Sequence, residues 1–147
     1  MEIGVKLLTP GAVLPSKAYE GDAAFDLCST VDLTLAPQER ATVPTGLALV
    51  LPPHVAALTV PRSGLAATHG VTIVNAPGLI DPGYRGEIRI VLLNTDRAAA
   101  FHVAPGDRIA QLLFVALTPV TLVEVGEIDD THRGERGFGS SGQSVRL

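Results

Sequence analysis

Short apolar runs, divided by clusters of Gly, Pro, Asn and Asp, limit this chain to an all-β fold. Turn signals that recur at intervals of about 8–12 residues are typical of a β-sandwich or β-barrel. No amphipathic helical period is sustained, and the best helix candidate is the short stretch 63–69. The expected strands are residues 3–8, 23–29, 31–35, 46–51, 55–60, 71–74, 87–93, 109–115 and 122–125.

Composition indicates one well-packed domain. With 147 residues and 46% hydrophobic side chains, the chain can bury a sizeable core. A net charge of −4 without a basic run argues against a nucleic-acid partner. No apolar stretch reaches the roughly 18 residues of a membrane span, and the N-terminus lacks a signal-peptide pattern. The single cysteine, Cys28, excludes an internal disulfide and suits a reducing compartment. Together these features lead us to expect a cytoplasmic protein with no membrane partner.

The composition changes abruptly near residue 126, where apolar side chains become scarce. We expect a β domain over residues 1–128 and a flexible, Gly-rich C-terminal arm over residues 129–147. In the arm, Phe138 lies among glycines and follows Arg133. Glycine-rich backbone and a guanidinium suit a phosphate, and an aromatic face suits a planar base. An unstructured tail is the alternative.

The stretch 75–88 is the best candidate for the chemistry. It lies between two strand-like runs, which predicts a β-hairpin with an elaborated tip. The tip carries a carboxamide, Asn75, a carboxylate, Asp81, and a phenol, Tyr84, and Pro82-Gly83 turns the chain between the last two. A loop held in this way can aim a base. From the hairpin alone, an ordinary turn with Tyr84 as a core aromatic is the alternative.

Residues 61–66 predict an anion site. Arg62 offers a planar fork of donors, Ser63 a hydroxyl that is placed to cap the expected helix, and Gly64 a close backbone approach. The first N–H groups of a helix add further donors. A simple capped turn with a solvated arginine is the alternative.

Two polar side chains interrupt apolar strands. A buried, unpaired carboxylate is costly, so Asp26 is expected at a wet edge or facing a positive charge. A buried carboxamide needs partners for both of its ends, so Gln111 satisfies a neighbouring strand or projects into a site. For Asp26, a hydrogen bond to a neighbouring turn is the alternative.

Taken in order, five stretches resemble the motifs of the trimeric deoxyuridine triphosphate nucleotidohydrolases, the dUTPases. The resemblance extends from about residue 20 to residue 142, and in it Phe25 and Ser141 replace the frequent Tyr and Thr. The motifs are Ala24-Phe25-Asp26-Leu27, Pro61-Arg62-Ser63-Gly64-Leu65-Ala66, residues 78–86, Gly106-Asp107-Arg108-Ile109-Ala110-Gln111 and residues 133–142.

The resemblance implies a jelly-roll β-barrel or sandwich assembled as a homotrimer, in which each active site draws on all three chains. It implies hydrolysis of dUTP to dUMP, a precursor for thymidylate synthesis, and pyrophosphate, with Mg²⁺ as cofactor. Asp81 would deprotonate the water that attacks the α-phosphorus, and Tyr84 would exclude a 2′-hydroxyl. Phe138 would stack on uracil, and Asp26 would touch the water shell of the metal. The other implied substrate-binding residues are Arg62, Ser63, Gly64, Asn75, Gly78, Leu79, Ile80, Arg89, Gln111, Arg133, Gly139, Ser140 and Ser141.

Two other functions remain open at this point. A dCTP deaminase shares the jelly roll but needs a glutamate base near the cytosine amino group, whereas the hairpin carries Asp81. A non-catalytic protein that senses dUTP and signals to a partner would need neither Asp81 nor a closing arm.

Overall fold

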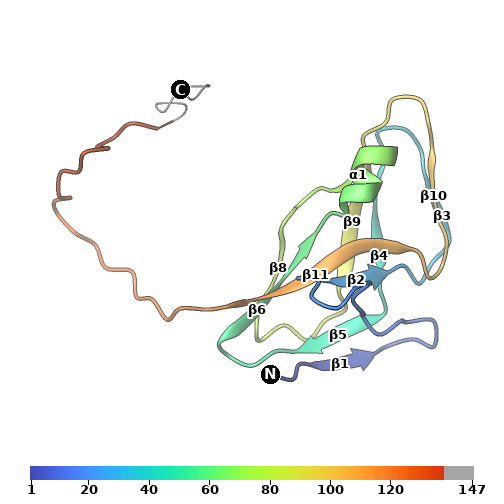
Figure 1. Cartoon of the computed structure of the whole chain (residues 1–147), viewed down its shortest axis with the longest axis horizontal. Helices are drawn as coiled ribbons and strands as arrows, with labels where there is room; N and C mark the ends of the chain where they lie inside the picture. The colour runs from blue at the N-terminus through green and yellow to red at the C-terminus, as the bar shows by residue number, and fades with distance from the viewer. Residues whose placement is uncertain (138–147) are drawn as a thin grey trace.

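The computed structural model describes residues 1–137, and its regular structure is β-sheet with one short helix (Figure 1). The strand pairs are antiparallel. The four-stranded sheet has the order β2 (Phe25–Cys28), β11 (Arg108–Ala116), β6 (Val55–Val60), β8 (Gly78–Ile80). The three-stranded sheet has the order β4 (Arg40–Pro44), β9 (Arg89–Asn94), β7 (Val71–Ile73). Two further pairs are β1 (Gly4–Leu7) with β5 (Leu47–Val50), and β3 (Leu33–Leu35) with β10 (Phe101–Val103).

The core is aliphatic, as the scarcity of aromatic residues requires. Leucine, isoleucine and valine side chains from most of the strands are fully buried in one cluster. In β9 the burial alternates along the strand, so one face lies against the core and the other toward solvent. Burying this apolar surface is the main favourable term that holds the strands together. The all-β prediction is therefore confirmed.

The hairpin predicted around residues 75–88 forms, but its tip is not a free loop. β7 pairs with β9, with Ile73 opposite Leu92. Between them the chain crosses to the other sheet, where β8 pairs with β6 and Gly78 lies opposite Thr59. A Cβ at position 78 would overlap the Thr59 hydroxyl, so glycine is needed for this close approach.

The structure corrects several local predictions. The helix α1 (Ser63–His69) has the expected bounds, but Arg62 is its N-cap, and it makes no side-chain capping bond. Ser63 is the first helical residue, so its predicted role as a cap is wrong. Strands β4, β8 and β10 also form, although the predicted set lacks them: β4 alternates polar and apolar residues as a half-buried strand does, β8 lies within the predicted hairpin tip, and β10 lies inside a polar connection. The strand predicted at 122–125 is absent from the described chain, where this segment is extended and exposed.

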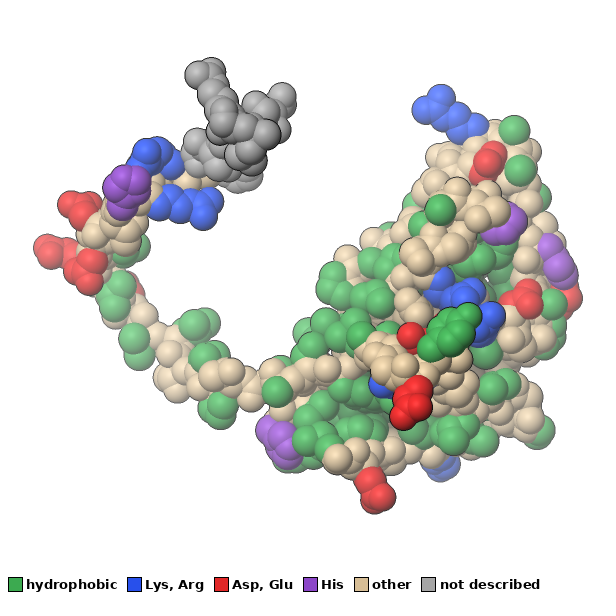
Figure 2. Space-filling model, viewed as in Figure 1, with side chains coloured by type: hydrophobic (Ala, Val, Ile, Leu, Met, Phe, Trp, Pro, Cys, Tyr) green, Lys and Arg blue, Asp and Glu red, His purple; other side chains and the backbone are tan. Residues whose placement is uncertain are grey.

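After Leu117, whose N–H still donates to the carbonyl of His54 at 2.9 Å, the chain runs away from the domain (Figures 1 and 2). Figure 2 shows hydrophobic side chains along this narrow segment. Val120, Leu122 and Ile128 are 78%, 95% and 89% exposed, values at which a side chain gains nothing from its own domain. No helix within residues 1–137 has the length and apolarity that a membrane crossing requires.

We expect Gly46→Ala to lower the free energy of unfolding by about 2 kcal/mol or more. Gly46 has φ +67°, and a Cβ there would lie 2.7 Å from Thr9 Oγ1 and 2.8 Å from Ala12 Cβ. Gly11→Ala is the matched control, since its Cβ would meet nothing within 4 Å, and it should change stability by less than about 1 kcal/mol. Urea denaturation at one protein concentration measures both, and equal stability of the two variants would contradict the expectation.

Candidate active site

Two hollows on the domain hold most of the predicted site residues that the structure describes. The hairpin pocket has a volume of about 230 Å³ and is lined by the tip of the β7–β9 hairpin, with Thr59 from β6. The arginine pocket has a volume of about 480 Å³ and is lined by residues of the 18–24 loop, by Asp26 of β2, by Arg62 at the start of α1, and by Arg108 and Gln111 of β11. The two share no lining residue. In the four-stranded sheet β8 flanks one side of β6, and β11 and β2 lie on the other.

Asp81 stands at the mouth of the hairpin pocket, directly after β8. Ile80 before it is only 8% exposed and anchors the strand in the core, whereas Asp81 itself is exposed. The Asp81 carbonyl accepts the N–H of Tyr84 at 3.1 Å, which closes a tight turn. The carboxylate is thus carried on a short, well-anchored turn beside the pocket, as a positioned base requires.

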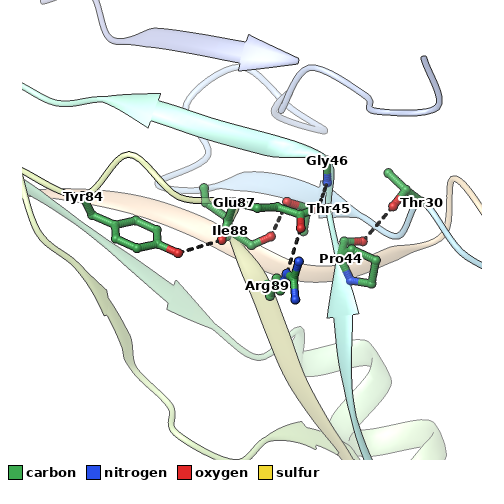
Figure 3. A network of polar contacts seen from close by, with 8 residues as sticks. All are labelled: Thr30, Pro44, Thr45, Gly46, Tyr84, Glu87, Ile88 and Arg89. Atoms are coloured by element: carbon green, nitrogen blue, oxygen red, sulfur yellow. Dashed lines mark hydrogen bonds and ion pairs between the residues drawn. The ribbon is translucent and has the colours of Figure 1, made fainter. Parts of the chain in front are cut away.

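Tyr84 forms one wall of the same pocket and is not a core aromatic. It is 48% exposed, and its hydroxyl donates to the carbonyl of Glu87 at 3.1 Å (Figure 3). The ring lies over Gly86, where a Cβ would overlap it. The alternative in which Tyr84 fills the core is therefore wrong.

Asp26 forms the centre of the arginine pocket. It is 8% exposed, and its two oxygens face two guanidinium groups. Oδ1 lies 3.3 Å from Arg62 Nε, and Oδ2 accepts from Arg108 Nη1 at 3.1 Å. The prediction that this carboxylate faces positive charge is confirmed. Pairing with two cations offsets the cost of removing the carboxylate from water.

Oδ1 of Asp26 has no hydrogen-bond partner among the described residues, although Arg62 lies close to it. Arg62 instead donates from Nη1 to the carbonyl of Arg108 at 3.0 Å, so it is held in place rather than solvated. Burial raises the pKa of the nearby Cys28 thiol, and the charge of Asp26 raises it further. The thiol therefore keeps its proton and adds no charge to the pocket.

The other predicted residues divide between the two pockets and the arm. Gln111 is half-buried, lies opposite Asp26 in the β2–β11 register, and lines the arginine pocket. Ser63 and Gly64 open α1 directly after Arg62 and are exposed. The residues that line the hairpin pocket with Asp81 and Tyr84 are Asn75, Gly78, Leu79, Ile80 and Arg89.

The described part of the arm, residues 129–137, is not brought to either pocket of its own chain. Arg133 lies on the segment that runs away from the domain, where its Nε donates to the carbonyl of Arg136 at 3.1 Å. Phe138, Gly139, Ser140 and Ser141 lie outside the described residues.

Several residues of these pockets lie outside the set predicted from the sequence, among them Thr59, Glu87 and Arg108. Thr59 is 5% exposed and lines the hairpin pocket, and Glu87 stands in the wall of that pocket. Arg108 belongs to a predicted motif without an assigned role, although it pairs with Asp26. Two sequence signals point to these positions: Thr59 is a polar residue within an apolar strand, and Glu87 is a charged residue directly before Ile88.

Comparison with known proteins identifies the family. The dUTPase family model matches residues 11–142. The deoxyuridine 5′-triphosphate nucleotidohydrolase of Leifsonia xyli subsp. xyli is 56% identical over 132 residues, which cover 90% of this chain and 87% of the relative. The enzyme of the same name from Thermobifida fusca is 51% identical and covers 97% of this chain and 79% of the relative.

Solved structures show the same fold. The dUTPase of Staphylococcus bacteriophage 80alpha with dUpNHpp has a TM-score of 0.90 at 30% identity, covering 97% of this chain and 99% of that one. A mutant dUTPase of phage phi11 of S. aureus, whose structure describes the coordination of a structural Mg(II) ion, has a TM-score of 0.82 at 26% identity, covering 88% and 100%. These matches favour dUTP hydrolysis over dCTP deamination. The chain belongs to the dUTPase family and is a deoxyuridine 5′-triphosphate nucleotidohydrolase.

Proposed function

We propose that each active site combines the hairpin pocket of one subunit with the arginine pocket of another, in a homotrimer with a jelly-roll subunit. There, water attacks the α-phosphorus of dUTP with the assistance of Mg²⁺, giving dUMP and pyrophosphate. The observation that carries the proposal is the separation of Asp81 from Asp26, Arg62 and Gln111 in pockets that share no lining residue. One nucleotide needs a base and phosphate-binding groups together, and a second copy of the chain can supply the missing half.

In this proposal the hairpin pocket takes the nucleoside. Asn75 and the backbone of Gly78, Leu79, Ile80 and Arg89, all of which line the pocket, bind the uracil edge. An amino group in place of the uracil carbonyl would face donors, and a 5-methyl group would clash, which selects uracil over cytosine and thymine. Tyr84 lies under the deoxyribose and leaves no room for a 2′-hydroxyl.

The phosphates are assigned to the arginine pocket. Arg62 and Gln111 line it, and Ser63 and Gly64 begin the helix beside it. A guanidinium, a carboxamide and free N–H groups are suitable partners for phosphate oxygens. The protein has a net charge of −4 and the substrate is an anion, so local cancellation of charge is necessary.

Asp26 fits an outer role toward Mg²⁺. Its buried Oδ1 lacks a hydrogen-bond partner among residues 1–137 and can accept from a water molecule. Mg²⁺ prefers oxygen ligands and usually keeps several of its waters. When bound, the ion neutralises charge on the phosphate oxygens. Arg62 and Arg108 hold the Asp26 carboxylate in the orientation that this contact needs.

Asp81 is the proposed base. Its carboxylate takes a proton from water, the water oxygen bonds to the α-phosphorus, and the bond to the oxygen that bridges the α- and β-phosphorus breaks. Pyrophosphate leaves with that electron pair, and the proton passes to solvent. A general base contributes about 10²–10⁴-fold, so positioning and charge cancellation must supply the rest.

The exposed apolar surface supports the assembly. The side chains of residues 120–128 are largely exposed, and a groove of about 390 Å³ on the domain is lined by apolar residues such as Ile3, Phe25 and Phe114. Surfaces of this kind are typical of contacts between subunits. We assign residues 129–147 to an arm that closes a site between two other subunits. Its residues Arg133, Gly139, Ser140 and Ser141 would bind the γ-phosphate, and Phe138 would stack on uracil.

The substitution Asp81→Asn should leave affinity for dUpNHpp within about tenfold and lower turnover by about 10²-fold or more, because it removes the base but keeps the side-chain size. Calorimetry measures the binding, and pyrophosphate release with Mg²⁺ measures the rate. Asp32→Asn, at an exposed position outside both pockets, is the control. Comparable turnover in Asp81→Asn would remove Asp81 from the role of base.

The substitution Asp26→Asn tests the proposed contact between Asp26 and the water shell of Mg²⁺. The amide carries no charge and accepts more weakly, so the Mg²⁺ concentration at half-maximal rate should rise by about 10–100-fold, the usual effect of losing an outer-shell carboxylate. A titration of the rate with MgCl₂ at saturating dUTP measures it. An unchanged midpoint would show that Asp26 does not face the ion.

Deletion of residues 131–147 should leave the trimer intact, since the deleted part lies beyond the domain. It should strongly lower kcat for dUTP, since in this proposal the deleted part closes the site. Light scattering after gel filtration gives the mass, and pyrophosphate release gives kcat. A truncated trimer with the kcat of the full chain would show that the arm has no part in the reaction.

A further inference from the structure

Glu87 is a mostly buried carboxylate in the wall of the hairpin pocket. Its side chain is only 17% exposed, and it precedes the buried Ile88, just before β9 begins at Arg89. A carboxylate at such a position is costly unless its oxygens are hydrogen-bonded. The proposed reaction does not use this carboxylate, so its place in the wall of the pocket requires another explanation.

Both oxygens of Glu87 are hydrogen-bonded, and they join two elements (Figure 3). Oε1 accepts the backbone N–H of Gly46 at 2.9 Å, and Oε2 accepts from Arg89 Nε at 2.8 Å. Gly46 belongs to the turn between β4 and β5, and Thr9 and Ala12 crowd the position of its missing Cβ. Glu87 is therefore attached to a part of the domain that has little freedom to move.

The peptide that follows Glu87 is held from both sides. Its N–H, on Ile88, donates to the carbonyl of Leu47 at 2.7 Å. Its C=O, on Glu87, accepts the hydroxyl of Tyr84 at 3.1 Å. The contacts to the β4–β5 turn thus fix the acceptor that holds the end of the Tyr84 ring, as Figure 3 shows.

We infer that Glu87 is a positioning residue that sets the discrimination between dUTP and UTP. It ties the wall of the hairpin pocket to Gly46 and so holds Tyr84 in the place where the ring excludes a 2′-hydroxyl. Arg89 neutralises the Glu87 carboxylate, which keeps the wall from repelling an anionic nucleotide. The inference rests on the proposed role of Tyr84 against the sugar.

The ring of Tyr84 depends on the Glu87 backbone because Tyr84 is exposed. Nearly half of the side chain lies in solvent, so packing alone holds it weakly. Its hydroxyl bond and its contact with Gly86 define the ring position. A shift of the Glu87 backbone by a fraction of an ångström would move the acceptor and let the ring turn away from the sugar. The kcat/KM values for substrates with and without a 2′-hydroxyl would then lie closer together.

The test compares kcat/KM for dUTP and for UTP on the same preparation of the full-length enzyme with Mg²⁺. Partial unfolding lowers both values equally and cancels in their ratio, so a merely structural role would not change it. We expect Glu87→Ala to lower the dUTP-to-UTP ratio by about tenfold. Glu87→Gln keeps an acceptor for Gly46 but faces Arg89 with a donor, and it should lower the ratio by more than twofold.

Glu39→Ala is the matched control, because the Glu39 carboxylate also accepts one backbone N–H, from Ala36, but outside both pockets. Its ratio should stay within twofold of the wild type. A ratio for Glu87→Ala less than threefold below the wild-type value overturns the inference. If Glu87→Ala does not fold, an unchanged ratio for Glu87→Gln overturns it. Tyr84→Ala separates the two proposals, since an unchanged ratio there contradicts the role of Tyr84 itself.

Discussion

The pairing of β8 with β6 is the constraint on which the rest of the site depends. It takes the tip of the β7–β9 hairpin out of its own sheet and attaches it to the neighbouring one. The close approach needs Gly78 opposite Thr59, and the buried Ile80 fixes the end of the strand. Asp81 follows at once, so the carboxylate stands beside a pocket instead of on a loose turn. The position of the proposed base is therefore a consequence of sheet pairing.

Electrostatic balance is the second constraint, and it is met locally. The protein has a net negative charge, yet its substrate is a phosphorylated anion. Around the arginine pocket, Asp26 is paired with Arg62 and Arg108, and burial keeps the Cys28 thiol neutral. The same two arginines that compensate the Asp26 charge also orient its carboxylate. Charge compensation and positioning are therefore one arrangement.

Two features of the single chain need an explanation beyond its own fold. Asp81 and the groups assigned to the phosphates occupy separate pockets, and residues 120–128 carry apolar side chains into solvent. Both features have the same explanation if neighbouring copies supply the missing surfaces. Membership of the dUTPase family is established by the matches themselves, whereas the shared site is a proposal that would explain both features.

The sequence by itself determined the β class, the bounds of α1 and the chemical groups of the site, because apolar periodicity, turn residues and functional side chains are local properties. Only the tertiary structure decided that β8 pairs with β6, that β4 and β10 are strands, and that Ser63 does not cap α1. It also decided that Glu87 binds Gly46, 41 residues away in sequence. Such contacts join segments that are distant along the chain, and no local pattern encodes which of them will meet.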